Sequence, residues 1–213
     1  MNERSKFIYD ELNNLFPNAK CELNHDSVFQ LVCAVSLSAQ TTDERVNMVT
    51  PALFAKYPDA LAMSKADLKD VEQLIKSIGL YHNKAVHLIT MSQQLIERFD
   101  GVVPSTMEEL TTLDGVGRKT ANVVLSVGFD VPALAVDTHV ARVSKRLGLA
   151  KKDSDVLAIE QQLMKKFPKY LWNHLHHLLI FFGRYLCKAR QPMCEQCPFT
   201  LICKEYKKLN LTK

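Results

Sequence analysis

Apolar residues recur at helical spacing through most of this 213-residue chain, and no stretch shows the sustained alternation of apolar and polar residues that is typical of a strand. Glycine and proline are scarce, with 7 and 8 residues, so extended loops must be few. Apolar residues make up 47% of the sequence, which is enough for a substantial core. We therefore predict an all-α fold, organised as one large or two small domains.

Capping residues and glycines mark the ends of the predicted helices. Ser27 is a candidate N-cap, and Ser105 with Glu108 has the form of a capping box. We expect Pro51 to break or restart the helix that Thr42 opens. The helices for which the sequence suggests both ends span residues 3–15, 64–79, 83–99, 118–127, 138–147, 154–167 and 171–186.

The charge distribution supports nucleic-acid binding only weakly. The net charge is +4, and basic residues gather in 142–152 and 184–213, where they could also be ordinary solvated faces. The first residues lead directly into an amphipathic pattern, without the apolar run of a secretory signal. The longest strongly apolar run, 178–182, is far too short to span a membrane. We therefore expect a cytoplasmic protein, and a monomer.

Two predicted helices are joined by Gly115-Val116-Gly117, and the second begins at Arg118. Glycine permits positive φ and close approach of the backbone. The helix that follows directs its unpaired N–H groups and its positive end outward, where a DNA phosphate would fit. Such a contact positions a duplex without reading its sequence. The alternative is an ordinary helix–helix turn in which the glycines serve only sterics.

The longer string Leu113-Asp114-Gly115-Val116-Gly117-Arg118-Lys119-Thr120-Ala121 resembles the helix-hairpin-helix motif of the endonuclease III family of DNA glycosylases. The family most often has proline where this chain has Asp114, and an acidic group there weakens DNA contact unless it is turned away. The resemblance implies a six-helix barrel over residues 21–131, with the hairpin at about 108–127. It also implies an iron–sulfur cluster domain of residues 1–20 and 132–213, with duplex DNA in the cleft between the two.

Lys119 lies in the first turn of the helix after the hairpin. The positive helix end disfavours a cation, so we expect part of this amine to be neutral and nucleophilic. The alternative is a solvated surface charge. The resemblance assigns Lys119 the attack on C1′ of a damaged nucleotide. That attack expels the base, forms a Schiff base and cleaves the strand on the 3′ side by β-elimination. It implies a bifunctional glycosylase and lyase that acts on oxidised pyrimidines and abasic sites.

Asp137 follows the apolar segment 132–136 and precedes a helical pattern, so it is a natural N-cap. A capping carboxylate keeps a second oxygen for another role. The resemblance places the matching aspartate opposite Lys119, where it helps to deprotonate the nucleophile and stabilises the cationic sugar. We interpret His139 as a packing residue or a phosphate contact.

A glycosylase must extrude the damaged nucleotide, and a side chain must fill the gap. The string from Leu37 to Asp43 resembles the family loop whose glutamine enters that space, which indicates Gln40. The string from Ile78 to Ala85 resembles the loop whose leucine wedges into the opposite strand, which indicates Leu80. The alternatives are a polar residue at a helix C-terminus for Gln40 and a core leucine for Leu80.

Four cysteines have the spacing C-x6-C-x2-C-x5-C: Cys187, Cys194, Cys197 and Cys203. In a reducing compartment this crowding indicates a metal site rather than disulfides. Zinc and a [4Fe–4S] cluster both accept four cysteines, but the spacing resembles the endonuclease III cluster loop. The resemblance therefore implies one [4Fe–4S] cluster per chain. We expect that cluster to hold Lys188 and Arg190 against the DNA backbone.

Three other functions compete with this interpretation. Mismatch adenine glycosylases share the hairpin, the aspartate and the cluster but usually lack the lysine, so Lys119 argues against them. A DNA-binding helix-hairpin-helix module would need neither Lys119 nor Asp137. An iron–sulfur electron carrier would need no hairpin.

Overall fold

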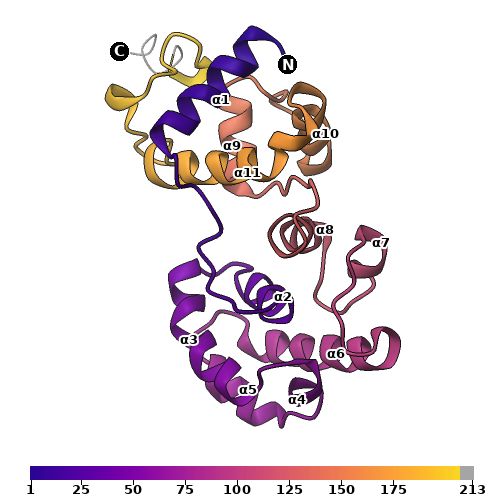
Figure 1. The fold of residues 1–213 in the computed structure, drawn as a ribbon. Coiled ribbons are helices and arrows are strands. Elements are labelled where there is room, and N and C mark those ends of the chain that lie inside the picture. The colour runs from indigo at the N-terminus through magenta and orange to yellow at the C-terminus, as the bar shows by residue number, and fades with distance from the viewer. Residues whose placement is uncertain (207–213) are drawn as a thin grey trace. The chain divides into compact units, whose positions relative to one another are not determined.

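The computed structural model describes residues 1–206, which contain helices and no strand (Figure 1). The all-α prediction is therefore confirmed. The helices group into two compact units. One unit is Glu22–Val131, and the other joins Met1–Cys21 to the chain from Pro132 onward.

The unit of residues 22–131 is built around one long helix, α6. This helix packs against α4 and α5, while α2 packs against α3, α8 and the π-helical turn that continues α8. The elements are α2 (Val28–Leu37), α3 (Asp43–Lys56), α4 (Ala60–Ser64), α5 (Leu68–Ile75), α6 (Tyr81–Phe99), α7 (Met107–Leu110), α8 (Arg118–Val123) and the π-turn Val124–Gly128.

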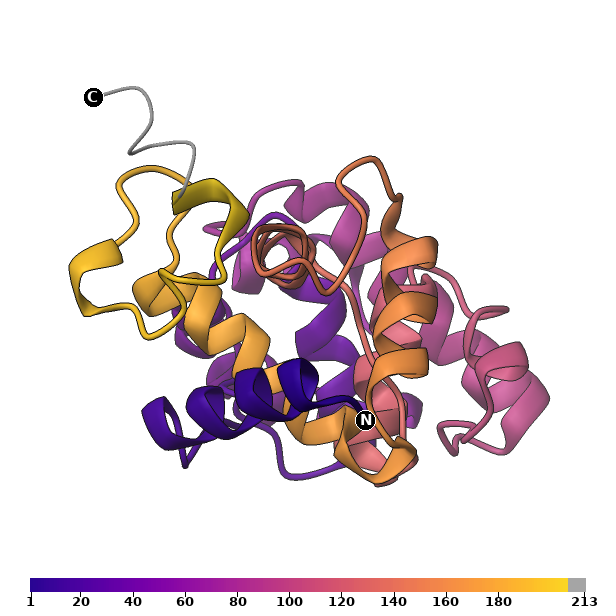
Figure 2. The same cartoon turned by 90° about the horizontal axis from the view of Figure 1, so that it is seen from above.

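The second unit has its own hydrophobic core, in which Phe182 and Phe199 are fully buried with their rings edge to face. The N-terminal helix α1 packs beside α11 and buries Ile8 and Leu12 (Figure 2). The elements are α1 (Glu3–Leu15), α9 (Thr138–Arg146), α10 (Val156–Lys166), the 3-10 turn Lys169–Leu171, α11 (Trp172–Phe181), the π-turn Phe182–Leu186 and the 3-10 turn Cys194–Gln196.

Several helix boundaries agree with the sequence predictions. Helix α1 spans the predicted 3–15, and the Ser27 side chain caps α2 by accepting the Gln30 N–H at 3.2 Å. The prediction that Pro51 breaks or restarts a helix is wrong, because α3 continues through this residue. Pro51 is exposed, so water can replace the donor that proline lacks.

Two more boundaries differ from the predictions. Ser64 ends α4 instead of starting a helix, because Asp59 and Asp67 supply the caps of α4 and α5. The cap of α7 is shifted by one residue from the predicted box. Thr106 accepts the Glu109 N–H at 3.2 Å and donates to the Glu109 carboxylate at 2.7 Å.

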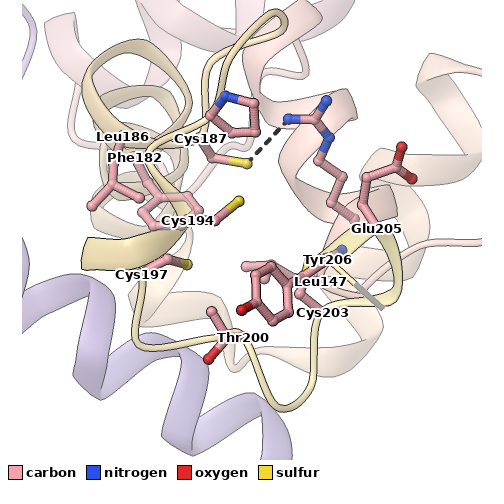
Figure 3. Close-up of a pocket in the computed structure, with 12 residues that line it drawn as sticks. Leu147, Phe182, Leu186, Cys187, Cys194, Cys197, Thr200, Cys203, Glu205 and Tyr206 are labelled. Atoms are coloured by element: carbon pink, nitrogen blue, oxygen red, sulfur yellow. Dashed lines mark hydrogen bonds between the residues drawn. The ribbon is translucent and has the colours of Figure 1, made fainter. Parts of the chain in front are cut away.

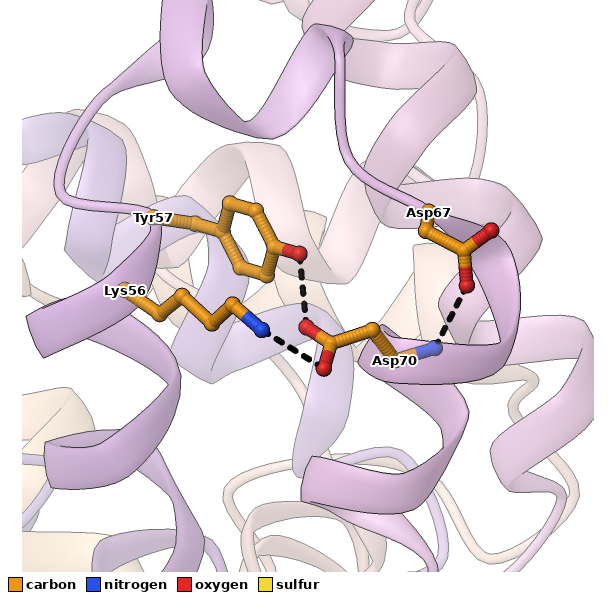
Figure 4. Close-up of polar contacts among 4 residues, drawn as sticks. All are labelled: Lys56, Tyr57, Asp67 and Asp70. Atoms are coloured by element: carbon orange, nitrogen blue, oxygen red, sulfur yellow. Dashed lines mark hydrogen bonds and ion pairs between the residues drawn. The ribbon is translucent and has the colours of Figure 1, made fainter.

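A small polar group joins the end of α3 to α5 (Figure 4). The Asp70 carboxylate accepts from Lys56 Nζ at 2.7 Å and from the Tyr57 hydroxyl at 2.6 Å. Burial and then the contact with Asp70 raise the pKa of Tyr57 to about 12, so this phenol stays a donor. The group fixes α3 against α5, and α5 in turn packs against α6.

Candidate active site

The hairpin turn between α7 and α8 is held by short-range hydrogen bonds and by α6. The Val116 N–H donates to the Leu113 carbonyl at 3.1 Å, which closes the turn. Gly115 has a φ of 72°, and a Cβ built on it would lie 2.9 Å from the His87 Cβ. Glycine is therefore required at 115 both by backbone conformation and by contact with α6.

Gly117 is different, because it does not use the positive φ that glycine permits. Its φ is −85°, and a Cβ built on it would meet no atom within 4 Å. The fold of residues 1–206 therefore places no steric demand on this glycine. As the N-cap of α8, Gly117 has no side chain that could bond to the first-turn amides. These N–H groups therefore face open space in which an anion fits.

Asp114, the departure from the family motif, is turned toward α6. Its carboxylate lies 2.6 Å from His87 Nδ1, and its N–H donates to the Gln94 side-chain oxygen at 2.7 Å. A carboxylate only accepts, so Nδ1 carries the proton in this contact. The acidic group is thus engaged inside its own unit.

Lys119 lies one residue into α8 and is exposed. Its amine makes no hydrogen bond or ion pair with any of residues 1–206. Arg118 beside it is exposed too, so the start of α8 presents two cations next to the open space at Gly117. An accessible, unengaged amine at this place can act as a nucleophile.

Asp137 caps α9, as predicted: its Oδ1 accepts the Val140 N–H at 2.8 Å. Among residues 1–206 its Oδ2 has no hydrogen-bond partner, so one oxygen remains available for chemistry. Two residues on, the His139 ring accepts from Arg142 Nη2 at 3.2 Å, and Arg142 also donates to the Gly183 carbonyl at 2.8 Å. His139 is thus fixed against the helix that leads to the first cysteine.

Gln40 and Leu80 share an unusual backbone conformation. Both are non-glycine residues in the left-handed region, with φ of 56° and 60°. Leu80 is 59% exposed, which excludes the core-leucine interpretation. Such strain persists only where the surrounding structure imposes it, and it is typical of functional sites.

The sequence analysis assigned no role to Lys84, which lies in the first turn of α6, four residues after Leu80. Its side chain is buried, and its Nζ donates to the Leu37 and Ala39 carbonyls. A signal was present, since Lys84 falls on the same face of α6 as the buried Leu88 and Met91. A lysine within an apolar stripe predicts a buried, fully paired ammonium.

The four cysteines line one pocket and direct their sulfur atoms into it (Figure 3). Among residues 1–206, no group of three or more His, Cys, Asp or Glu side chains is arranged to hold a metal ion. Two donors reach the sulfurs: Arg146 Nη1 lies 3.4 Å from Cys187 Sγ, and the Tyr206 N–H lies 3.5 Å from Cys203 Sγ. Hydrogen bonds to cysteine sulfur also occur around iron–sulfur groups.

Burial disfavours the charged form of two of the cysteines. It raises the pKa of the Cys197 thiol to about 11 and the pKa of the Cys194 thiol above its usual value. A cation that binds these thiols would therefore have to displace their protons. The four thiols, their shared pocket and the two hydrogen bonds to sulfur fit a group held by four cysteines.

Arg146, a second residue whose role the sequence analysis did not assign, anchors the chain after Cys187. Its guanidinium donates to the Lys188 carbonyl at 2.8 Å and to the Ala189 carbonyl at 3.2 Å. The Lys188 and Arg190 side chains are exposed. The backbone of this loop is therefore fixed while its cations face outward.

Comparison with known proteins identifies the family. Residues 33–169 match the model of the HhH-GPD superfamily of base excision DNA repair proteins. Endonuclease III of Bacillus subtilis is 52% identical over 203 residues, which cover 95% of this chain and 93% of that protein. This chain belongs to the endonuclease III family. Endonuclease III of Synechocystis is 48% identical, over 94% of this chain and 92% of that protein.

Solved structures agree with this assignment to the endonuclease III family. A trapped endonuclease III–DNA covalent intermediate matches with a TM-score of 0.94 and 50% identity, over 99% of this chain and all of that one. A thermostable thymine-DNA glycosylase matches with a TM-score of 0.88 at 22% identity, which shows the shared fold.

Membership of the endonuclease III family confirms the predicted family, fold and enzyme class. The protein is a base excision repair enzyme, a DNA glycosylase that is also a lyase. Within residues 1–206, no helix has the length and apolar character needed to cross a membrane.

Proposed function

We propose that this enzyme removes oxidised pyrimidines from duplex DNA and then cleaves the strand through the amine of Lys119. The observation that carries the proposal is this exposed and unengaged amine in the first turn of the hairpin helix. A relative 50% identical to this chain was trapped as a covalent intermediate with DNA, which supports a nucleophilic side chain.

The chemistry follows from the residues. The Lys119 amine attacks C1′ while the N-glycosidic bond breaks, and the base leaves with the bonding electrons and gains a proton. Opening of the sugar ring moves a proton to O4′ and leaves an imine between C1′ and Nζ. Loss of a C2′ proton then expels the 3′ phosphate by β-elimination, and hydrolysis returns the lysine. Asp137 Oδ2 is the proposed proton acceptor and the stabiliser of the cationic sugar.

Binding of the duplex is assigned to the remaining predicted residues. The backbone of Gly115, Val116 and Gly117, together with Arg118, would hold phosphates at the start of α8. Gln40 would fill the gap left by the extruded nucleotide, and Leu80 would enter the opposite strand. The exposed Lys188 and Arg190 would add phosphate contacts.

Cys187, Cys194, Cys197 and Cys203 would hold one [4Fe–4S] cluster, as their shared pocket supports. When bound, the group cross-links a loop that has little regular structure and so stabilises its fold. Arg146 Nη1 donates to the Cys187 sulfur, and the same guanidinium holds the carbonyl of Lys188. The chain's own residues therefore couple the cysteine pocket to the basic loop.

The test of the enzyme is a comparison of Lys119→Ala with Lys69→Ala, an exposed lysine on α5. On a duplex with a single thymine glycol, Lys119→Ala should lose strand cleavage and the adduct trapped by borohydride, and bind an abasic-site duplex nearly as well. Lys69→Ala should keep all three properties. Borohydride adducts at the normal yield in Lys119→Ala would remove this lysine from the mechanism.

The lesion class and the cofactor need separate measurements. Duplexes with oxidised pyrimidines should be cleaved far faster than duplexes with oxidised purines; the reverse preference would contradict the proposed substrate.

The purified protein should contain iron and acid-labile sulfide and absorb visible light, and Cys203→Ser should lose them. Stoichiometric zinc in place of iron would contradict the cluster. Light scattering should show a monomer, and a stable dimer would correct that proposal.

A further inference from the structure

Lys84 is a buried cation that has no acidic partner among residues 1–206. Its residue is 7% exposed, and its Nζ donates to the Leu37 carbonyl at 2.8 Å, the Ala39 carbonyl at 2.6 Å and the Thr41 hydroxyl at 3.1 Å. An ammonium has three protons, so these contacts satisfy all of them. The acceptors lie on both sides of Gln40 along the chain.

The same residue is tied to the second loop by its backbone. The Lys84 N–H donates to the Leu80 carbonyl at 3.1 Å, which closes the first turn of α6. A Cβ built on Gly79 would lie 3.9 Å from the Gln40 carbonyl oxygen, so the two loops pass close to each other. The segments around Gln40 and Leu80 are therefore one connected structure, and Lys84 is bonded to both.

This arrangement lowers the stability of the fold in two ways. Burial lowers the pKa of Lys84, which means that the fold disfavours its charge. Its neighbours on α6, Leu88 and Met91, are buried and apolar, so an uncharged side chain would suit this face of the helix. The left-handed backbones of Gln40 and Leu80 cost on the order of 1–3 kcal/mol each. A buried ammonium that holds two strained loops together is better explained by what those loops do.

We propose that Lys84 is a positioning residue for base extrusion, which holds the Gln40 and Leu80 loops in register so that both enter the duplex together. The inference rests on the proposed roles of Gln40 and Leu80. It assigns Lys84 no part in bond breaking. Loss of Lys84 should therefore slow the opening of a paired duplex and leave the later chemistry nearly unchanged.

The test uses Lys84→Met, which keeps the length of the side chain and removes its hydrogen bonds. Single-turnover excision is measured on one lesion in two settings, fully paired and placed in an unpaired bulge that is already unstacked. We expect a loss of roughly tenfold or more on the paired lesion, as for lost hydrogen bonds to a charged group, and a loss below about threefold on the bulge. A 2-aminopurine opposite the lesion should brighten more slowly when Lys84→Met is mixed with the paired duplex.

Thr41→Val is a milder second variant, in case Lys84→Met does not fold. It removes one of the three hydrogen-bond acceptors of Lys84 and leaves the ammonium in place. It should show a smaller loss of the same kind, on the paired lesion only. Lys69→Met should match the wild type. Equal losses on both substrates, or wild-type 2-aminopurine kinetics, would overturn the inference. It would also be overturned if Lys84→Met fails to fold while Thr41→Val keeps the wild-type rate on the paired lesion.

Two further variants separate this inference from the proposal on which it rests. Gln40→Ala and Leu80→Ala should each slow excision of the paired lesion. If both keep the wild-type rate, the proposed insertion roles are wrong and the inference falls with them. If both are slow and Lys84→Met is not, only the inference about Lys84 is wrong.

Discussion

The Asp114 carboxylate lies 2.6 Å from Nδ1 of His87, so the acidic residue of the hairpin turn is engaged by helix α6. This contact explains how the chain tolerates an acid where its family usually has proline. The turn that is proposed to meet a phosphate carries a negative charge, and His87 holds that charge to one side.

His87→Ala should therefore weaken DNA binding, because the carboxylate loses its partner beside the phosphate. We expect a loss of about three- to tenfold at low salt, which corresponds to one poorly screened charge near a surface. Asp114→Asn in the same chain should restore the affinity. Fluorescence anisotropy with an abasic-analogue duplex measures the DNA affinity of both variants. If the double variant binds DNA as weakly as His87→Ala does, the lost affinity comes from altered packing and not from the charge of Asp114.

The two hairpin glycines should respond differently to alanine. Gly115→Ala places a side chain at φ of 72° and against His87, so we expect it to destabilise the fold by about 1–3 kcal/mol. Gly117→Ala meets no atom within 4 Å and should leave the melting temperature unchanged while it weakens DNA binding. Urea unfolding and anisotropy distinguish the two effects. Normal DNA affinity in Gly117→Ala would show that no phosphate approaches this residue closely.

Substitutions at Asp137 can separate its cap from its chemistry. Asn caps a helix as well as Asp does, so Asp137→Asn should keep the bond to the Val140 N–H and the wild-type stability. It should lose base release by about 10²- to 10⁴-fold, the usual contribution of a positioned acid–base group. Asp137→Ala should lose the activity and also about 1 kcal/mol of stability. Full excision activity in Asp137→Asn would reduce this residue to a helix cap.

His177 should make the stability of its unit depend on pH. Burial, followed by the nearby His176 and His174, lowers the pKa of His177 to about 3 from its ordinary 6.5. The unfolded chain therefore binds a proton below pH 6.5 that the folded chain does not bind until about pH 3. The free energy of unfolding is therefore unaffected by this histidine above pH 6.5, and it decreases as the pH falls from 6.5 toward 3.

The partial exposure of His177 reduces the effect, and we expect a loss of roughly 1–2 kcal/mol between pH 7 and pH 5. The urea midpoint measured at both pH values should shift less in His177→Gln than in the wild type. His82→Gln, which changes an exposed histidine of the other unit, should keep the wild-type shift. An unchanged shift in His177→Gln would show that His177 is already charged or solvated in the fold.

Local sequence was sufficient where a residue acts on its own neighbours. Ser27 and Asp137 were predicted as caps because a capping side chain bonds to an amide three positions away. The hairpin turn is local in the same way, since a backbone bond between Val116 and Leu113, three positions apart, closes it. Pro51 and Ser64 were misassigned because exposure of the first, and competition of Asp59 and Asp67 with the second, are not visible in local periodicity.

The sequence by itself determined that this chain is helical and that its cysteines cluster, because these properties follow from periodicity and spacing. The hairpin with its lysine was identified from the resemblance of a short string to the endonuclease III family. Only the tertiary structure decided that Asp114 faces His87, that Gly115 but not Gly117 is required by packing, and that Lys84 joins two strained loops. The last of these contacts spans more than forty residues. Such contacts depend on how helices pack, and no local pattern encodes the partner.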